Sequence, residues 1–199
     1  MPLHANASGA ALRFGRGRAW ALTLLGVMAM MEPGMAEGLR VTSVQARLSQ
    51  SRLLVSGNVD IALTPKVEEA LNNGIPLEFV FEVRLHRRRA LIWDQTTRSF
   101  SARRELRYHA LAGQYLVTRR GPGEPTRASF QTLAEALVAV GSLDDSLALD
   151  PPLEGSGDYR VGVRVHLDIE ALPPVLRPVA YTSRAWDLNS GWTMWTVQP

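Results

Sequence analysis

The sequence contains no cysteine and, among its 199 residues, a single lysine, Lys66. The absence of cysteine excludes disulfides, thiol catalysis and a lipid anchor on cysteine. The other 21 of the 22 basic residues are arginines, which we interpret as the codon usage of a GC-rich genome. Apart from the leader described next, the sequence has no apolar stretch near the roughly 20 residues that span a bilayer as a helix.

The first 36 residues have the pattern of a signal peptide. Three arginines precede an apolar stretch at residues 19–31, and the small residues Gly34 and Ala36 follow it. This stretch fits the roughly 7–15 residues of a signal-peptide core and is too short to span a membrane. We therefore expect Sec-dependent export to the periplasm with cleavage after Ala36. An uncleaved membrane anchor is the alternative.

Residues 37–199 predict one β-rich domain. Apolar and polar residues alternate along most of this region, which is typical of strands with one buried face. Strands are expected at residues 39–63 as a hairpin, and at 77–85, 92–111, 114–119, 159–169 and 179–197. Within residues 92–111, Arg104 interrupts the apolar phase, so a bend or bulge is expected near it. Residues 142–157 read as a polar connection.

Two short helices are predicted between these strands. Thr64 and Pro65 are suited to the start of the first, and Thr132 and Glu135 form a capping box at the start of the second. Strands and helices do not alternate, so a parallel sheet is not expected. The predicted fold class is mainly β: an antiparallel β-sandwich or a strongly curved sheet of about seven to eight strands with two short helices.

Three separated segments resemble one protein family. They are ALNNGIPLEFVFEV at residues 70–83, LRYHAL followed by QY within residues 106–115, and SRAWDL followed by GW within residues 183–192. Together with Trp93-Asp94, they are similar to a proteobacterial family of exported proteins, the domain of unknown function DUF4390. Because its members are often encoded near a membrane sensor kinase, the resemblance implies an envelope location and such a kinase as partner. It implies no activity or catalytic residue.

Motifs for catalysis, metal binding or cofactor binding are not found. His86, His109 and His166 follow the leader, and no two have the spacing of metal ligands on one element. A nucleophile elbow and a phosphate-binding glycine loop are also missing. We predict no catalytic residue, no cofactor and no metal. The alternative is an unrecognised cell-wall hydrolase or glycan-modifying enzyme, which requires His109, His166 and Asp168 to converge in a cleft.

The charges are unevenly distributed along the chain. Residues 84–127 contain eleven arginines and three acidic residues, whereas residues 128–170 contain eight acidic residues and two arginines. Pairing across neighbouring strands is one explanation. The other is a basic surface that meets an acidic partner or anionic lipid headgroups.

The candidate partner-binding residues combine arginines with tryptophans, which are enriched at interaction hot spots. They are Arg87, Arg88, Arg89, Trp93, Trp186, Trp192 and Trp195. For Trp186, Trp192 and Trp195, the alternative to partner binding is packing in the hydrophobic core. We predict a non-enzymatic binding or accessory domain whose partner is an envelope protein. Nucleic acid is not expected as a partner, and membrane contact is at most peripheral, through residues 87–89. The oligomeric state stays open.

Overall fold

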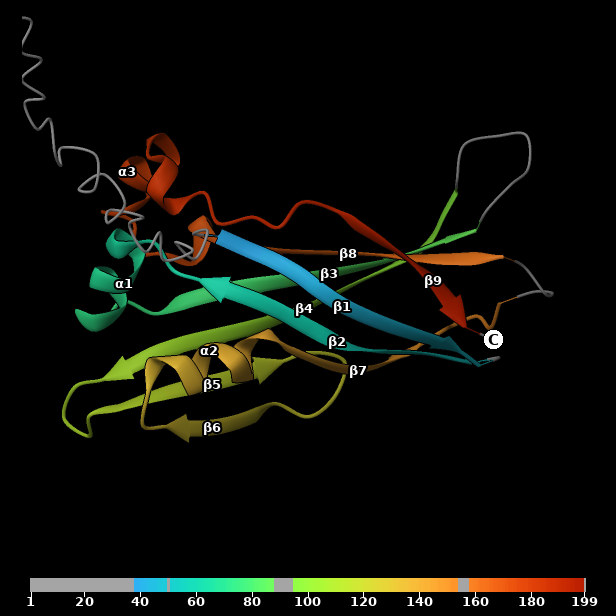
Figure 1. Ribbon diagram of the computed structural model, residues 1–199, viewed down its shortest axis with the longest axis horizontal. Coiled ribbons are helices and arrows are strands. Elements are labelled where there is room, and N and C mark those ends of the chain that lie inside the picture. Colours follow the sequence, from blue (N-terminus) through green and yellow to red (C-terminus); the bar gives the residue numbers. More distant parts are fainter. Residues whose placement is uncertain (1–37, 50, 88–94, 154–157, 199) are drawn as a thin grey trace, which may run out of the picture. The chain divides into compact units, whose positions relative to one another are not determined.

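The computed structural model describes residues 38–49, 51–87, 95–153 and 158–198 (Figure 1). Within these ranges, nine strands form one strongly curled sheet with the order β6-β5-β4-β3-β8-β9-β1-β2-β7. The strands are β1 (Gly38–Leu48), β2 (Arg52–Ala62), β3 (Leu77–Arg87), β4 (Gln95–His109), β5 (Gln114–Arg120), β6 (Thr126–Phe130), β7 (Ser142–Ala148), β8 (Tyr159–Leu167) and β9 (Thr193–Gln198). This confirms the predicted mainly β fold in its strongly curved form.

Neighbouring strands are antiparallel except for β1 and β9, which pair in parallel at Ala46–Val197 and Arg47–Gln198. The short final strand β9 therefore joins the two halves of the sheet, because its other neighbour is β8. The predicted hairpin at residues 39–63 is confirmed as β1 and β2. Residues 142–157 were predicted to be a connection, but they begin with β7, whose Asp144 and Asp145 have low strand propensity.

The described residues include three α-helices: α1 (Pro65–Asn72), α2 (Leu133–Gly141) and α3 (Arg177–Thr182). The two predicted caps are confirmed, since the Thr64 side chain accepts a hydrogen bond from the Val67 N–H group and Thr132 and Glu135 form a capping box. Residues 179–197 were predicted as strands, but they contain part of α3 and a 3-10 turn before β9. None of these helices has the length and apolar character needed to cross a membrane.

Helix α2 closes the curled sheet. It connects β6 directly to β7, and these two strands are the opposite edges of the sheet. At its end the helix backbone lies against β2: a Cβ atom added to Gly141 would lie 2.0 Å from the carbonyl oxygen of Val59. A glycine at this position therefore permits the close approach of α2 to β2.

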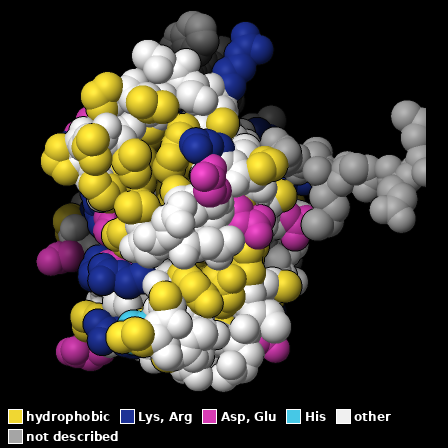
Figure 2. Space-filling view, turned by 90° about the vertical axis from the view of Figure 1, so that its left-hand side faces the viewer, with side chains coloured by type: hydrophobic (Ala, Val, Ile, Leu, Met, Phe, Trp, Pro, Cys, Tyr) yellow, Lys and Arg dark blue, Asp and Glu magenta, His cyan; other side chains and the backbone are white. Residues whose placement is uncertain are grey.

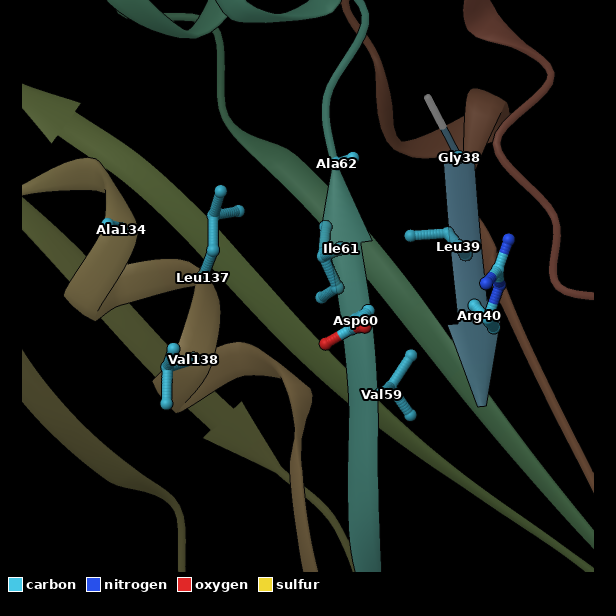
Figure 3. A pocket seen from close by; sticks show the side chains of 10 residues that line it. All are labelled: Gly38, Leu39, Arg40, Val59, Asp60, Ile61, Ala62, Ala134, Leu137 and Val138. Carbon is cyan, nitrogen blue, oxygen red and sulfur yellow. The ribbon is translucent and has the colours of Figure 1, made fainter. Parts of the chain in front are cut away.

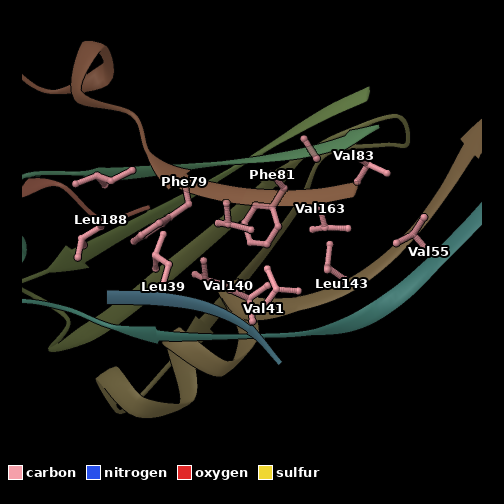
Figure 4. Packing of buried hydrophobic residues seen from close by; sticks show 14 of the residues in the cluster. Leu39, Val41, Val55, Phe79, Phe81, Val83, Val140, Leu143, Val163 and Leu188 are labelled. Carbon is pink, nitrogen blue, oxygen red and sulfur yellow. The ribbon is translucent and has the colours of Figure 1, made fainter. Parts of the chain in front are cut away.

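The two halves of the sheet enclose the hydrophobic core. In Figure 4, Leu39 and Val41 on β1 point toward Phe79 and Phe81 on β3. Alternate residues of β2, β3 and β8 point into this space, as the predicted alternation requires. The largest fully buried side chains are Phe79, Phe81, Leu53, Leu71, Leu77, Leu85, Leu106 and Leu172.

One charged side chain lies inside this core. Arg104 is only 2% exposed and lies between the buried residues Ala102 and Leu106 on the inner face of β4. The bulge predicted near Arg104 is wrong, because the shift in pairing between β3 and β4 occurs at Leu85 and His86 instead. Inward and outward side chains continue to alternate along β4. The Arg104 side chain points inward, like those of Ala102 and Leu106.

The Arg104 guanidinium joins β4 to the far edge of the sheet. Its Nη1 atom donates hydrogen bonds to the carbonyl oxygens of Val140 and Ser142, the latter at 2.6 Å. Its Nη2 atom lies 3.4 Å from a carboxylate oxygen of Asp145, and its central carbon lies 3.9 Å from the centre of the Phe81 ring. Burial lowers the pKa of Arg104 from 12.5 to about 10, so the group stays charged at neutral pH.

We predict that Arg104→Met destabilises the protein by about 3–5 kcal/mol, because it leaves buried carbonyl groups and Asp145 without a donor. Arg107→Met is the matched control: Arg107 lies on the same strand but on the exposed face, where an ion pair contributes about 0–1 kcal/mol. Urea unfolding of both variants measures the difference. Equal stability of the two variants would contradict the structural role of Arg104.

Candidate functional site

The three histidines do not converge. His166 pairs with Val80 on β3, and Val80 pairs with Arg103 on β4. His109 lies six residues along β4 from Arg103, which corresponds to roughly 20 Å at the rise of a strand. His86 lies six residues along β3 from Val80. In the part of the chain that the structure describes, no three His, Asp or Glu side chains gather closely enough to hold a metal ion.

Asp168, which the hydrolase alternative would need beside His109 and His166, belongs to an ionic network instead. Arg103 donates hydrogen bonds to Glu78 and to Asp168, the latter at 2.7 Å. Arg120 lies 3.4 Å from Glu78 and 2.9 Å from Glu105. The hydrogen bonds to Glu78 and Asp168 raise the pKa of Arg103. Cross-strand pairing thus neutralises part of the arginine-rich segment, residues 84–127. One acid of this network, Asp168, comes from the acidic segment, residues 128–170.

An aromatic platform lies further along the same outer face, on β3, β8, the start of β9 and the residue before it. The Trp192 ring covers Gly162: a Cβ atom added there would lie 3.3 Å from the ring and 3.0 Å from the sulfur of Met194. The Arg84 guanidinium stacks on Trp192, 4.2 Å from the ring centre. His86 also borders Gly162. We use the name aromatic platform for Arg84, His86, Trp192 and Met194.

The side chains of the platform are held in place but remain accessible. Trp192 is 37% exposed and Met194 is 43% exposed, although tryptophan and methionine usually lie in protein interiors. Because Gly162 has no side chain, the indole ring rests directly on the backbone of β8. The ring is therefore fixed before any partner arrives, which reduces the ordering entropy lost on binding.

The surroundings of the platform are basic. Arg160 pairs with His86, and Arg164 pairs with Glu82, in the register of β3 and β8. The oxygens of Glu82 lie 3.7 Å from Arg164 and 4.0 Å from Arg84. Among these described residues, three arginines stand beside one carboxylate, an excess of positive charge that favours an acidic ligand.

His166 is a half-buried titratable group on this face. Its pKa is lowered by burial and by the neighbouring Arg164. Its Nδ1 atom is buried and has no hydrogen-bond partner among the described protein groups. The neutral imidazole is therefore favoured in the folded protein.

We predict that the protein loses stability as the pH falls from 7 to 5. Since the pKa of His166 is lower in the folded state than its ordinary value of 6.5, the unfolded chain takes up this proton first, and acid favours unfolding. Unfolding free energies measured by urea titration at both pH values should show a smaller loss for His166→Gln. An unchanged pH dependence in this variant would contradict the assignment.

The predicted partner-binding residues occupy different environments. Trp192 is part of the aromatic platform, and Arg87 ends β3 in a half-buried position. Trp186 is buried in the core, and Trp195 is half-buried and packs against it. The remaining candidates, Arg88, Arg89 and Trp93, lie outside the described residues.

The sequence did not reveal the other members of the platform. Arg84, His86 and Met194 come together only through the register of β3, β8 and β9. Arg84 did carry a partial signal, because it occupies the outward phase of a strand whose inward phase is apolar. The glycine that interrupts β8 at position 162 was the second signal, since a glycine within a strand often marks a close approach.

A separate apolar area surrounds α3. Figure 2 faces the end of the molecule where this helix lies and shows hydrophobic side chains gathered on it. Val175, Val179 and Tyr181 are exposed there, and the Tyr181 hydroxyl donates a hydrogen bond to Glu170. Arg177 and Glu170 form an ion pair in the same area at 3.5 Å.

Comparisons with known proteins place the chain in a family. Searches of curated proteins and of solved structures each returned no match. Residues 36–196 match a family of protein domains, and this range includes all three segments on which the resemblance rests as well as the aromatic platform. The chain therefore belongs to the family described as Domain of unknown function (DUF4390).

Proposed function

We propose that the protein is a non-enzymatic binding or accessory domain of the cell envelope, and that its aromatic platform binds an acidic segment of another envelope protein. The observation that carries this proposal is the stack of Arg84 on the exposed Trp192 ring. Tryptophan and arginine are the residue types that most often dominate the binding energy of protein interfaces.

The chemistry of the platform supports a partner that combines carboxylates with apolar side chains. Arg84, Arg160 and Arg164 supply positive charge around the ring, and Met194 adds a flexible apolar surface that adapts to different partners. Electrostatic complementarity would direct the encounter, and the fixed indole ring would supply a desolvated anchor.

The first partner to test is the periplasmic part of a membrane sensor kinase, as the family resemblance implies. The hydrolase alternative has no specific support in the geometry, because the separation of His109 from Arg103 along β4 keeps His109 away from His166 and Asp168.

We predict that a photocrosslinking amino acid at Met194 captures one recurrent envelope protein in living cells, identified by mass spectrometry. The matched control is the same amino acid at Leu54, which is 47% exposed, similar to Met194 at 43%, but lies on β2. With the probe at Met194, Arg84→Gln or Trp192→Ala should lower the yield about tenfold, as expected for a hot-spot residue. Diffuse products, or the same product from both positions, would contradict the proposal.

We also predict that cell fractionation places the protein in the periplasm, and that its amino-terminal sequence begins at Glu37 because the leader is removed after Ala36. Edman degradation or mass spectrometry of the purified protein checks this. Replacing Gly34 and Ala36 by leucine should block processing, because the peptidase requires small residues there. A full-length protein in the membrane fraction would instead support the uncleaved anchor.

A further inference from the structure

Arg119 on β5 is an inward-facing arginine without a carboxylate of its own. It pairs with the buried Arg104 in the register of β4 and β5, and directly opposite residues of two paired strands lie on the same face. Asp145 lies 3.4 Å from Arg104, but among the described residues no carboxylate oxygen lies within 4.0 Å of Arg119. Two neighbouring guanidinium groups therefore stand beside one acid.

Most N–H donors of the Arg119 guanidinium have no acceptor in the described part of the chain. Its Nη2 atom donates a hydrogen bond to the Ala139 carbonyl oxygen near the end of α2, and no other described group accepts from the guanidinium. The contact is part-buried. Removing a charge from water is costly unless an opposite charge compensates it. The planar fork of a guanidinium fits a carboxylate, so this group favours a carboxylate ligand.

The Arg119 side chain lines a depression of about 660 Å³ between α2 and the strands β5 and β6. Phe130, Ala134 and Val138 supply apolar walls, and Ser142 adds a polar group. Small-molecule sites commonly have volumes of roughly 300–1,000 Å³ and combine apolar walls with a few polar groups that orient the ligand. The depression therefore has the size and composition of a site for a small molecule with an apolar body.

The charges of this depression are separated along α2. Arg119 binds the carbonyl group of Ala139, whereas Ala134 precedes Ala139 by five residues, about 7–8 Å along a helix. The one acid that lines the depression, Glu135, is held at the start of the helix by a hydrogen bond from the Thr132 N–H group. The site thus offers positive charge at one end only, which suits a ligand with a single carboxylate and an apolar body.

A second depression, of about 480 Å³, lies on the opposite flank of α2 and has a different charge. Figure 3 shows it between Ile61 on β2 and Leu137 on α2. In this view Asp60 extends toward α2, whereas Arg40 on β1 points away from the helix. A carboxylate in this position repels an anion. The two depressions are therefore chemically distinct, and the one next to Arg119 is the one suited to an anion.

We propose that the depression between α2, β5 and β6 binds a fatty acid, with its carboxylate on Arg119 and its hydrocarbon chain over Ala134, Val138 and Phe130. The chain covers Val138, which is apolar but 72% exposed in the described protein. This site is separate from the aromatic platform on β3, β8 and the start of β9, and it does not depend on the function proposed for that platform.

Titration of the purified protein with octanoate, followed by backbone amide NMR shifts, tests the chemistry of the ligand. Saturable shifts are expected in α2, β5 and β6, with a Kd of about 1 mM or lower. 1-Octanol has the same hydrocarbon chain without the carboxylate and should bind at least about tenfold more weakly, because a charge-assisted hydrogen bond is lost. Equal binding of the two compounds, or octanoate shifts that do not saturate or lie elsewhere, overturns the proposal.

Removal of the guanidinium tests the role of Arg119. Arg119→Met should abolish the preference for octanoate over 1-octanol. The matched control is Arg40→Met, which removes the same charge from an exposed position on β1 and should retain the preference. A preference that persists in Arg119→Met, or disappears in Arg40→Met, contradicts the assignment of the carboxylate to Arg119.

A third pair of variants keeps the test independent of folding, because Arg119 also holds α2. Val138 is exposed and borders the depression, so replacements there should fold. Val138→Glu introduces a carboxylate that competes for Arg119, and it should bind octanoate at least about tenfold more weakly than Val138→Gln, which has the same size without the charge. Equal affinity of these two variants for octanoate overturns the proposal.

Discussion

The closure of the sheet depends on a buried arginine. Arg104 reaches from β4, inside the sheet, to carbonyl groups at the end of α2 and the start of the edge strand β7. The end of a helix carries a partial negative charge, which a guanidinium complements. Arg119 on β5 acts in the same way on the Ala139 carbonyl group. Two inward arginines thus hold the helix that completes the core.

Neighbouring residues of β4 show how little residue type alone reveals about role. Arg103 and Arg104 are adjacent and chemically identical, yet Arg103 belongs to an ionic network on the surface and Arg104 lies in the core. Strand periodicity assigns them to opposite faces, but an arginine in the apolar phase is more easily interpreted as a break than as a core residue. The surface network also shows that an arginine-rich segment need not produce an equally basic surface.

Local patterns predicted the elements whose cause is local. The hairpin at residues 39–63, the Thr64 cap and the Thr132–Glu135 capping box depend on residues that are close in sequence, and all three are confirmed. The strand β7 and the aromatic platform depend on register between distant segments, such as Gly162 beneath Trp192. A single sequence does not give the register between distant strands. The sequence therefore indicated that tryptophan and arginine form a binding surface, but not that Arg84 and Trp192 are the two that contact each other.

The position of β9 affects how the protein can fold. This last strand lies between β8 and β1 in the middle of the sheet, so the first strand of the domain finds one of its two neighbours only when residues 193–198 have been synthesised. Contacts between such distant segments form slowly. The sheet is therefore complete only once residues 193–198 have paired with both β8 and β1, although the β1–β2 hairpin can form before them.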